Sequence, residues 1–566
     1  MSMFDLLNIG TRGLAAAQSQ LDLVGQNVTN ANTEGYSRKR ANLQAGARQD
    51  GVYGEVGFGV DVVNIKSMRD SLLNRQMQEV ATTLGEREQL DKELLSVENV
   101  LTEPSDSGLN KFLDKFWSSW QDLANNPADV TARQAVLDAS SSLVGRFQDI
   151  GNQFNQLIAA KNEEISSYTG QINQLLEGIA KDNQTISESE MGGERTTAND
   201  TRDQRELKLN ALSRMLEISY TEDAQGRYVI TAAGSLLVST EGALPLKVER
   251  SQFSLADGSQ VSRSTVTLSS TGQELEPAGG SLKSLFVTRD DIIPRYQNQI
   301  DEYAKRLVQS VNAQHSQGYD LAGSTGTNFF DPATTGASTI DLSATVKNGT
   351  AFLAAAFGGT SQGLGAPLDL TIPAAGEPLD IGNTVNTNYR NFSANSVIVR
   401  TVGPPSVLLK EGAGNDYTVD YRGGRIMFNN SAATMTAPGT DITVDFRYTS
   451  AAYNGQGDGN NALKIAQLAQ TKIAAPDQFG NYTATLGDAY SSLVGKLGAE
   501  KSNSASTLTT ATNLKDYLQK QIDSISGVSM DEELGNMVKF QNSYSASARY
   551  INTVSRLMDT LIGLGQ

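Results

Sequence analysis

The chain has 566 residues, which is more than one hydrophobic core usually organises and indicates three or four domains. Its 63 acidic side chains outnumber 46 basic ones, and the resulting net charge of −17 disfavours binding to nucleic acid or to anionic membranes. There is no cysteine and a single histidine, His315, which excludes disulfides and thiolate sites and argues against most metal-dependent and imidazole-dependent enzymes.

The first segment, residues 1–42, predicts an amphipathic helix. Apolar side chains recur three or seven residues apart from Phe4 to Val28 and form a narrow stripe along one face. Such a stripe is typical of a helix that packs against one partner helix rather than against a broad core. We therefore expect this segment to belong to an assembly component.

A tight turn is expected where this helix ends. Asn30, Asn32 and Gly35 are turn-forming residues that can adopt positive φ angles. Beyond the turn, Tyr36 and Arg38 are expected to contact a neighbouring subunit. The alternative is a loop that packs only on its own domain.

Five further helical patterns predict an elongated bundle built from distant parts of the chain. The first opens at Ile65 and Met68 and stops before Pro104. The second carries Trp117 and Trp120, which are expected in the bundle core. The others cover residues 143–179, 296–311 and 486–525. At 1.5 Å per residue, the near-heptad repeat over 143–179 predicts a rod about 55 Å long.

Two stretches between these helices have the character of β-structure. Residues 218–280 alternate polar and apolar side chains between glycine-containing turns, and residues 338–454 contain short strand-like runs in a Gly-, Ala- and Thr-rich context. The predicted fold class is mainly α with inserted β domains, in which the N- and C-terminal parts build an elongated, discontinuous helical bundle or coiled-coil stem. The expected domains are 1–42 with 528–566 as a terminal coiled coil, 43–217 with 281–337 and 455–527 as the helical bundle, 218–280 as a β-rich domain, and 338–454 as an outer β-rich domain.

The last segment, residues 528–566, predicts another narrow helical stripe. Ser529 and Glu532 form a capping box at its start, which is a sufficient reason for the acidic residues there and makes a metal site a weak alternative. We expect both terminal segments to be disordered in the free monomer, because burial within one chain would scarcely offset the entropy of ordering them. They should become paired helices on assembly.

The residues assigned to an assembly interface lie on both terminal segments and on the turn between helix and bundle. They are Phe4, Leu7, Leu14, Leu21, Val28, Asn30, Asn32, Gly35, Tyr36, Arg38, Leu534, Met537, Tyr544, Ala548, Ile551, Met558 and Leu561.

No catalytic, cofactor-binding or metal site is predicted. His315 lies near a helix end and is interpreted as structural, since no serine or carboxylate partner can be assigned to it from the sequence. Glycine-rich stretches at 54–59 and 455–459 lack the Gly-Lys-Ser/Thr element of a phosphate-binding loop and are interpreted as turns.

Residues 27–38, with the sequence Asn-Val-Thr-Asn-Ala-Asn-Thr-Glu-Gly-Tyr-Ser-Arg, closely resemble the N-terminal motif of the axial proteins of the bacterial flagellum. These are the rod, hook and hook-associated proteins. The stretch 57–60 and Ile65-Lys66 also fit, although Lys66 stands where the family often has arginine. Residues 529–534 and 541–549 are similar to the C-terminal signature of the same family.

Internal motifs are similar to those of the hook-associated junction members of this family. They lie at residues 199–205, 279–282, 293–296, 311–320, 328–330 and 457–461. Residues 338–450 match no pattern of the family, so the resemblance assigns no role to them.

The resemblance implies a structural protein that self-assembles into a ring linking hook to filament and is needed for filament assembly. The implied partners are further copies of the chain, the hook protein, the next hook-associated protein toward the filament, and a cytoplasmic export chaperone at the C-terminal region. Nucleic acid, membrane and cofactors are not implied. The implied location is extracellular, on the flagellum, reached through the type III channel, and residues 1–10 lack the basic region of a cleaved Sec signal peptide.

Three alternatives stay open at this point. The chain could be another axial protein, a hook or distal rod subunit, since all of these share the terminal motifs. The 338–454 insertion could act as an adhesin on such a protein. An enzyme could also be carried on the axial scaffold; the single histidine excludes a zinc protease, whereas a glycosidase that uses two carboxylates is not excluded by composition.

Overall fold

The computed structural model describes residues 3–46, 48–51, 54–101, 105, 108–191, 198–254, 260–357, 368–374, 377–381, 392, 396–403, 406–412, 415–421, 425–429, 439–446, 457–476 and 482–564. The helices are α1 (Met3–Thr29), α2 (Ser71–Leu101), α3 (Leu109–Asn125), α4 (Val130–Glu190), α5 (Asn199–Met215), α6 (Gly280–Val287), α7 (Ile293–His315), α8 (Ala344–Lys347), α10 (Asn460–Gln467), α11 (Leu486–Ser526) and α12 (Met530–Leu564). The strands are β1 (Lys39–Ala45), β2 (Arg48–Gly51), β3 (Gly54–Gly57), β4 (Val60–Ser67), β5 (Ser219–Glu222), β6 (Tyr228–Ala232), β7 (Ser235–Val238), β8 (Leu246–Ser254), β9 (Gln260–Leu268), β10 (Leu368–Thr371), β11 (Leu379–Asp380), β12 (Ile398–Thr401), β13 (Tyr417–Asp420), β14 (Arg425–Phe428), β15 (Asp441–Asp445), β16 (Ala474–Pro476) and β17 (Tyr482–Ala484).

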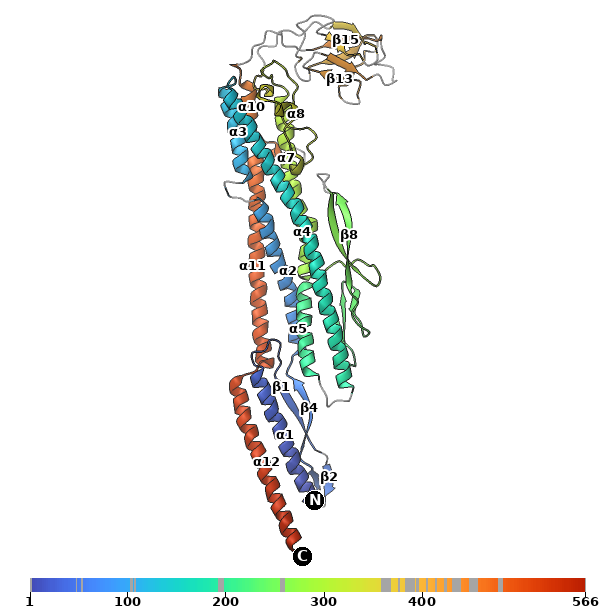
Figure 1. Cartoon of the computed structure of the whole chain (residues 1–566), viewed down its shortest axis with the longest axis vertical. Coiled ribbons are helices and arrows are strands. Elements are labelled where there is room, and N and C mark those ends of the chain that lie inside the picture. Colours follow the sequence, from blue (N-terminus) through green and yellow to red (C-terminus); the bar gives the residue numbers. More distant parts are fainter. Residues whose placement is uncertain are drawn as a thin grey trace.

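The molecule is long and narrow, and both ends of the chain lie at the same end of it (Figure 1). Helix α4 has 61 residues, so at 1.5 Å per residue it is about 90 Å long and exceeds the rod expected over 143–179. Helices α2 and α7 pack against it and α11 packs against α2, although these helices come from distant parts of the sequence. The predicted fold class, a discontinuous helical stem with inserted β-structure, is confirmed.

One hydrophobic core fills the part of the stem formed by α3, α7, α10, α11 and the N-terminal half of α4. The Phe116 and Trp117 ring centroids lie 4.7 Å apart, and those of Trp120 and Phe329 lie 5.2 Å apart, in edge-to-face arrangements. Trp120 and Phe116 are fully buried because the apolar positions of α3 share one helical face. The expected place of Trp117 and Trp120 in the bundle core is confirmed.

A second core lies where β-structure packs on the other half of α4. The three-stranded sheet β5–β6–β7 and the hairpin β8–β9 contribute to it together with α5 and α6. Ile172 and Ile179 of α4 are fully buried there, as are Ile230 and Val266 of the strands. The strands expected within 218–280 therefore cover one side of the stem, where the hairpin runs beside α4 (Figure 1).

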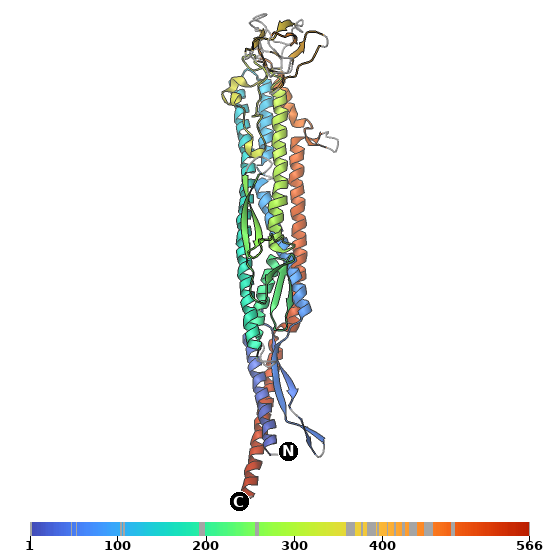
Figure 2. The same ribbon diagram turned by 90° about the vertical axis from the view of Figure 1, so that its right-hand side faces the viewer.

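An outer β module lies at the end of the molecule opposite the chain termini (Figure 2). Its two sheets, β10–β15–β12 and β11–β14–β13, share a small core of their own. The chain leaves the stem at Phe357 and returns at Asp458, whose Oδ2 accepts a hydrogen bond of 3.0 Å from the Phe357 N–H. The module is therefore connected to the stem by two adjacent chain segments, and its Tyr421 also lies against Gly326 of the stem.

Two expected domain boundaries are wrong. The outer domain was expected to begin at 338, but Ile340, Val346 and Leu353 are fully buried in the first core and belong to the stem. Likewise, the bundle was expected to begin at 43 and a helical pattern to open at Ile65. Residues 39–67 instead form an antiparallel ribbon of β1 and β4 along α1, in which Ala41 pairs with Ile65.

Candidate assembly site at the terminal rod

The two ends of the chain pack against each other as antiparallel helices. Together with the β1–β4 ribbon on the other side of α1, helices α1 and α12 form a slender unit that we call the terminal rod (Figure 1). A Cβ atom placed on Gly10 would lie 2.6 Å from Cγ1 of Ile551, and one on Gly13 would lie 3.1 Å from Oγ of Ser547. Glycines thus let the two helix backbones approach closely.

The residues that α1 buries differ from the stripe expected from sequence. Ala16, Ala17, Leu23 and Val24 are buried, whereas the expected residues Leu7, Leu14, Leu21 and Val28 are each only partly buried. The buried residues repeat at the same spacing of seven, since Ala16 is followed by Leu23 and Ala17 by Val24, so the expected stripe has the period of the buried face but lies on a neighbouring face of the helix. The signal that could have identified the true face is the run of small residues around Ala16 and Ala17.

On α12, the expected interface residues divide into two groups. Met537, Ala548, Ile551 and Met558 are partly buried. Leu534 remains exposed one helical turn from Val538, of which 59% is exposed, and Tyr544 is exposed on another face of the helix. The side chains of Phe4 and Leu561 lie outside the described residues. Helix α12 therefore presents an apolar flank that the described part of its own chain leaves uncovered, and we define this flank by Leu534 and Val538.

The rod meets the bundle at a polar joint centred on Asn27, at the end of α1. The Asn27 amide donates to the Lys39 carbonyl and to Oε2 of Glu533, each at 3.1 Å. Its Oδ1 accepts from the Tyr36 hydroxyl at 2.9 Å and from the Lys39 N–H at 3.0 Å. One buried amide thereby links α1, the turn, the ribbon and α12.

Arg38 clamps the start of α12 from the same turn. Its guanidinium contacts Oε2 of Glu532 at 2.7 Å and Oε1 of Glu533 at 2.8 Å, and Glu533 is almost fully buried. The Arg38 N–H donates to the Ser526 carbonyl at 2.8 Å. Ser529 caps α12 through a long hydrogen bond of 3.5 Å from the Glu532 N–H, so the Glu532 side chain serves the joint rather than a complete capping box.

Helix α5 supports the joint from the bundle. Lys39 forms an ion pair with Asp200, and Asp203 pairs with Arg69 and accepts from the Ser37 N–H. Burial, followed by the negative charges of Asp200 and Glu533, raises the pKa of Tyr36 to about 12, so its hydroxyl stays protonated and can donate.

The turn itself follows the expectation in part. Gly35 adopts a φ of 75°, while Asn30 and Asn32 do not take positive φ. Asn30 donates to the Gln26 carbonyl at 3.0 Å and so closes the end of α1. Tyr36 and Arg38 make contacts within their own chain, and a contact of either residue with a neighbouring subunit stays a prediction.

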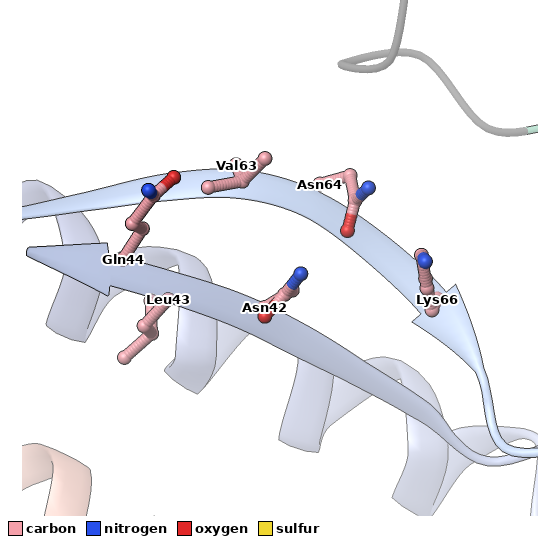
Figure 3. A pocket seen from close by; sticks show the side chains of 6 residues that line it. All are labelled: Asn42, Leu43, Gln44, Val63, Asn64 and Lys66. Carbon is pink, nitrogen blue, oxygen red and sulfur yellow. The ribbon is translucent and has the colours of Figure 1, made fainter.

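The outer face of the ribbon is hollowed (Figure 3). The hollow has a volume of about 430 Å³ and is lined by Asn42, Leu43, Gln44, Val63, Asn64 and Lys66. A register shift between Asn42 and Leu43 bends the ribbon here. Oδ1 of Asn64 is buried without a hydrogen-bond partner among the described residues.

Metal sites and membrane spans are absent from the described ranges. No group of three His, Asp or Glu side chains there could hold a metal ion. None of the helices in those ranges combines the length and apolarity needed to cross a membrane. His315 is fully buried and hydrogen-bonded on both ring nitrogens, so its place is in the core.

Comparison with known proteins agrees with this arrangement. Residues 94–330 match the family model described as "Flagellar hook-associated protein FlgK helical domain". The two ends match other models, residues 7–36 "Flagella basal body rod protein" and residues 519–564 "Flagellar basal body rod FlgEFG protein C-terminal".

Relatives that align with nearly the whole chain share one name. The chain is 26% identical over 585 residues to the flagellar hook-associated protein 1 of Salmonella typhimurium, covering 99% of this chain and 100% of the relative. It is also 26% identical over 604 residues to the protein of that name in Bacillus subtilis, covering 100% and 99%. The flagellar hook junction protein FlgK from Burkholderia pseudomallei has a similar fold, with a TM-score of 0.56 and 20% identity over 80% of this chain and 100% of that one.

Proposed function

The chain belongs to the family of flagellar hook-associated protein 1, and from this premise we propose that it is a subunit of the ring that joins hook to filament. The ring would be needed for the filament to assemble on the hook. Its role is structural, as in the rest of this family: the ring would connect two axial segments of the flagellum mechanically.

The observation that carries this proposal is the terminal rod. The chain brings its two ends, 506 positions apart at Asn27 and Glu533, into one antiparallel pair that still leaves an apolar flank exposed. An exposed apolar row on a narrow helical pair favours association with further subunits. Fixing the rod to the bundle through Arg38 and Asn27 would give every subunit the same orientation in a ring.

The proposed partners follow from that place in the flagellum. They are neighbouring copies of the chain, the hook protein on one side and the next hook-associated protein on the other. A cytoplasmic chaperone would hold the C-terminal region before type III export, and the uncovered flank of α12 is a surface of the kind such a chaperone could bind. The protein would then reach the outside of the cell without a cleaved Sec signal peptide.

A hook or distal rod subunit is the second candidate, because rod-protein models match both ends of the chain. The two roles differ in position along the flagellum. Isolated flagella that carry the labelled chain should show a narrow band between hook and filament. Label along the hook or in the rod would favour the second candidate and contradict the first.

Truncation tests the role of the rod. Removing residues 530–564 should leave a folded bundle, because neither hydrophobic core of the stem includes a residue of α12. The truncated chain should fail to restore filaments in cells that lack the full-length protein. Circular dichroism of the purified variant separates loss of assembly from loss of folding, and a truncated chain that still builds junctions would overturn this role.

A further inference from the structure

The ribbon places two like charges side by side without compensation. Arg40 and Lys66 are cross-strand partners in the β1–β4 ladder, and both side chains are exposed. Like charges directly opposite each other destabilise a strand pair. Neither side chain forms an ion pair within the described part of the chain. This arrangement costs the isolated chain stability and would be relieved by an acidic surface from outside.

An acidic surface of that kind lies on the opposite side of the same rod. Helix α12 begins with Asp531, Glu532 and Glu533 in its first turn. Asp531 is exposed and has no basic partner among the described residues, and Glu532 keeps a side-chain exposure of 63% despite its contact with Arg38.

The basic and acidic surfaces lie at the same height along the rod. The Asn27 amide contacts the Lys39 carbonyl and the Glu533 carboxylate at the same distance of 3.1 Å, which brings these two residues level. Arg40 is adjacent to Lys39, and Asp531 is within one helical turn of Glu533. Helix α1 separates the ribbon from α12, so the two surfaces point away from each other within one chain (Figure 1).

The lower part of the rod shows a matching pair of surfaces. Ribbon residues 42–46 descend toward the level of Arg12, whose side chain lies 3.1 Å from a Cβ placed on Gly46. On the other side of α1, Gly13 lies against Ser547. The amide-lined hollow around Asn64 is therefore level with the part of α12 between Glu533 and Ser547, which carries the exposed flank.

We propose that the outer face of the ribbon docks on the α12 flank of a neighbouring copy of this chain, with Arg40 and Lys66 facing Asp531 and Glu532. The hollow around Asn64 then receives the Val538 side chain of the flank. Because the two surfaces differ, the contact is head-to-tail, and repetition of such a contact generates a ring or a helical row. This inference rests on the proposed junction role and names the surfaces that join its subunits.

Cysteine crosslinking on isolated flagella tests the contact directly, because the chain contains no cysteine of its own. Asn64→Cys combined with Val538→Cys should give a ladder of crosslinked multimers under oxidation. The matched control is Asn64→Cys with Asn552→Cys, an exposed position 14 residues further along α12 and hence about 21 Å away. The control pair and the single-cysteine variants should stay monomeric on a denaturing gel.

Charge exchange gives a second, independent measurement. Lys66→Glu and Asp531→Lys should each lower the number of junctions per cell severalfold, and the double variant should recover to within about twofold of wild type because each contact then pairs opposite charges again. Both side chains are exposed, so circular dichroism should show unchanged folding.

The outcomes separate this inference from the proposed function. A chain that forms a normal junction band but gives no crosslink between positions 64 and 538, or a double variant as defective as the single ones, overturns the ribbon–α12 contact and leaves the junction role standing. A chain absent from the junction overturns the proposed function. A crosslink ladder together with charge-exchange rescue supports the contact.

Discussion

The structure defines the hydrogen-bond partners and the protonation state of His315, which the sequence alone does not. Its Nδ1 lies 2.7 Å from the Thr327 carbonyl oxygen, and its Nε2 accepts a hydrogen bond of 3.0 Å from the Ala354 N–H. The ring is therefore neutral, with its proton on Nδ1. Burial lowers the pKa of His315 to about 4, and the nearby positive charge of Arg133 acts in the same direction.

The stability of the stem should consequently fall in mild acid. Between pH 6.5 and 4 the unfolded chain protonates His315 while the folded chain does not, so the free energy of unfolding falls as pH falls. The contribution is on the order of 3 kcal/mol over this interval. Urea unfolding of wild type and His315→Gln at pH 7 and pH 4.5 measures it. The variant should lose less stability than wild type, and equal losses would contradict a neutral buried histidine.

Gly35 is required at the joint for both conformation and space. Its φ is 75°, and a Cβ placed there would lie 2.5 Å from Cγ of Leu207. Gly35→Ala should therefore loosen the joint, with a cost of about 1–3 kcal/mol. Gly25→Ala is the matched control, because Gly25 lies within α1 with nothing within 4 Å of its Cβ position. That change should stabilise α1 by about 0.5–1 kcal/mol.

The hydrogen-exchange rates of the α1 and α12 backbone amides would measure the effect of both substitutions on the order of the rod. Faster exchange in Gly35→Ala with slower exchange in Gly25→Ala is the expected pattern. Equal rates in both variants would show that the turn does not control the order of the rod.

At the scale of elements, two residues of α4 that share the near-heptad pattern differ in burial. Phe154 is fully buried in the first core, whereas Leu157 is only partly buried at its edge. A buried cation continues the same helix, where Lys161 pairs with Glu93 of α2 at 2.7 Å. The stripe of α4 thus changes from apolar contacts to an ion pair where α2 crosses it.

Substitutions on α4 should follow this difference in burial. Phe154→Asp places an unpaired charge in the core and should lower the free energy of unfolding by at least 3–5 kcal/mol, the usual cost of deleting a buried phenylalanine side chain alone. Leu157→Asp should cost clearly less, because its charge can reach water. Thermal melts followed by circular dichroism at 222 nm compare the two. Equal losses would mean that the face of α4 has been misassigned.

The β1–β4 ribbon is the element that sequence patterns described wrongly. Ile65 and Met68 have helical spacing with Leu72, but Val60, Val62 and Ile65 are β-branched residues that suit a strand. Pairing with β1, from Lys39↔Ser67 to Ala45↔Val60, provides the backbone partner that decides between the two. A helix at this place would leave β1 unpaired.

At the scale of the whole molecule, the stem and the outer module have separate hydrophobic cores, and the chain passes between them at Phe357 and Asp458. Replacing residues 358–456 by a short linker should leave the unfolding midpoint of the stem unchanged, since Phe357 and Asp458 are already hydrogen-bonded at 3.0 Å. Deletion of residues 338–456 is the control. It removes Ile340 and Val346 from the first core and should destabilise the stem strongly.

Melting of the two deletion variants checks this placement, and motility of cells carrying the shorter deletion checks whether the outer module is peripheral to the axial structure. Loss of stem stability in the 358–456 deletion would show that the module is part of the stem.

The sequence alone determined the helical stem, the terminal helices and the presence of inserted β-structure. These follow from local signals: apolar periodicity, turn residues such as Gly35, the serine cap at Ser529, and strand-like alternation in 218–280. Such signals depend on neighbours a few residues apart, so they are readable without the fold. The family resemblance of residues 27–38 is likewise readable without the fold, because it depends only on the order of residues within one short segment.

Only the tertiary structure decided which side chains meet. The hydrogen bond between Asn27 and Glu533, the packing of Gly10 against Ile551 and the pairing of β1 with β4 depend on how distant segments approach. The buried face of α1 likewise follows from its two neighbours, α12 and the ribbon, and not from its own apolar spacing. Local periodicity specifies that a face exists, but the free energy of packing between distant elements selects it.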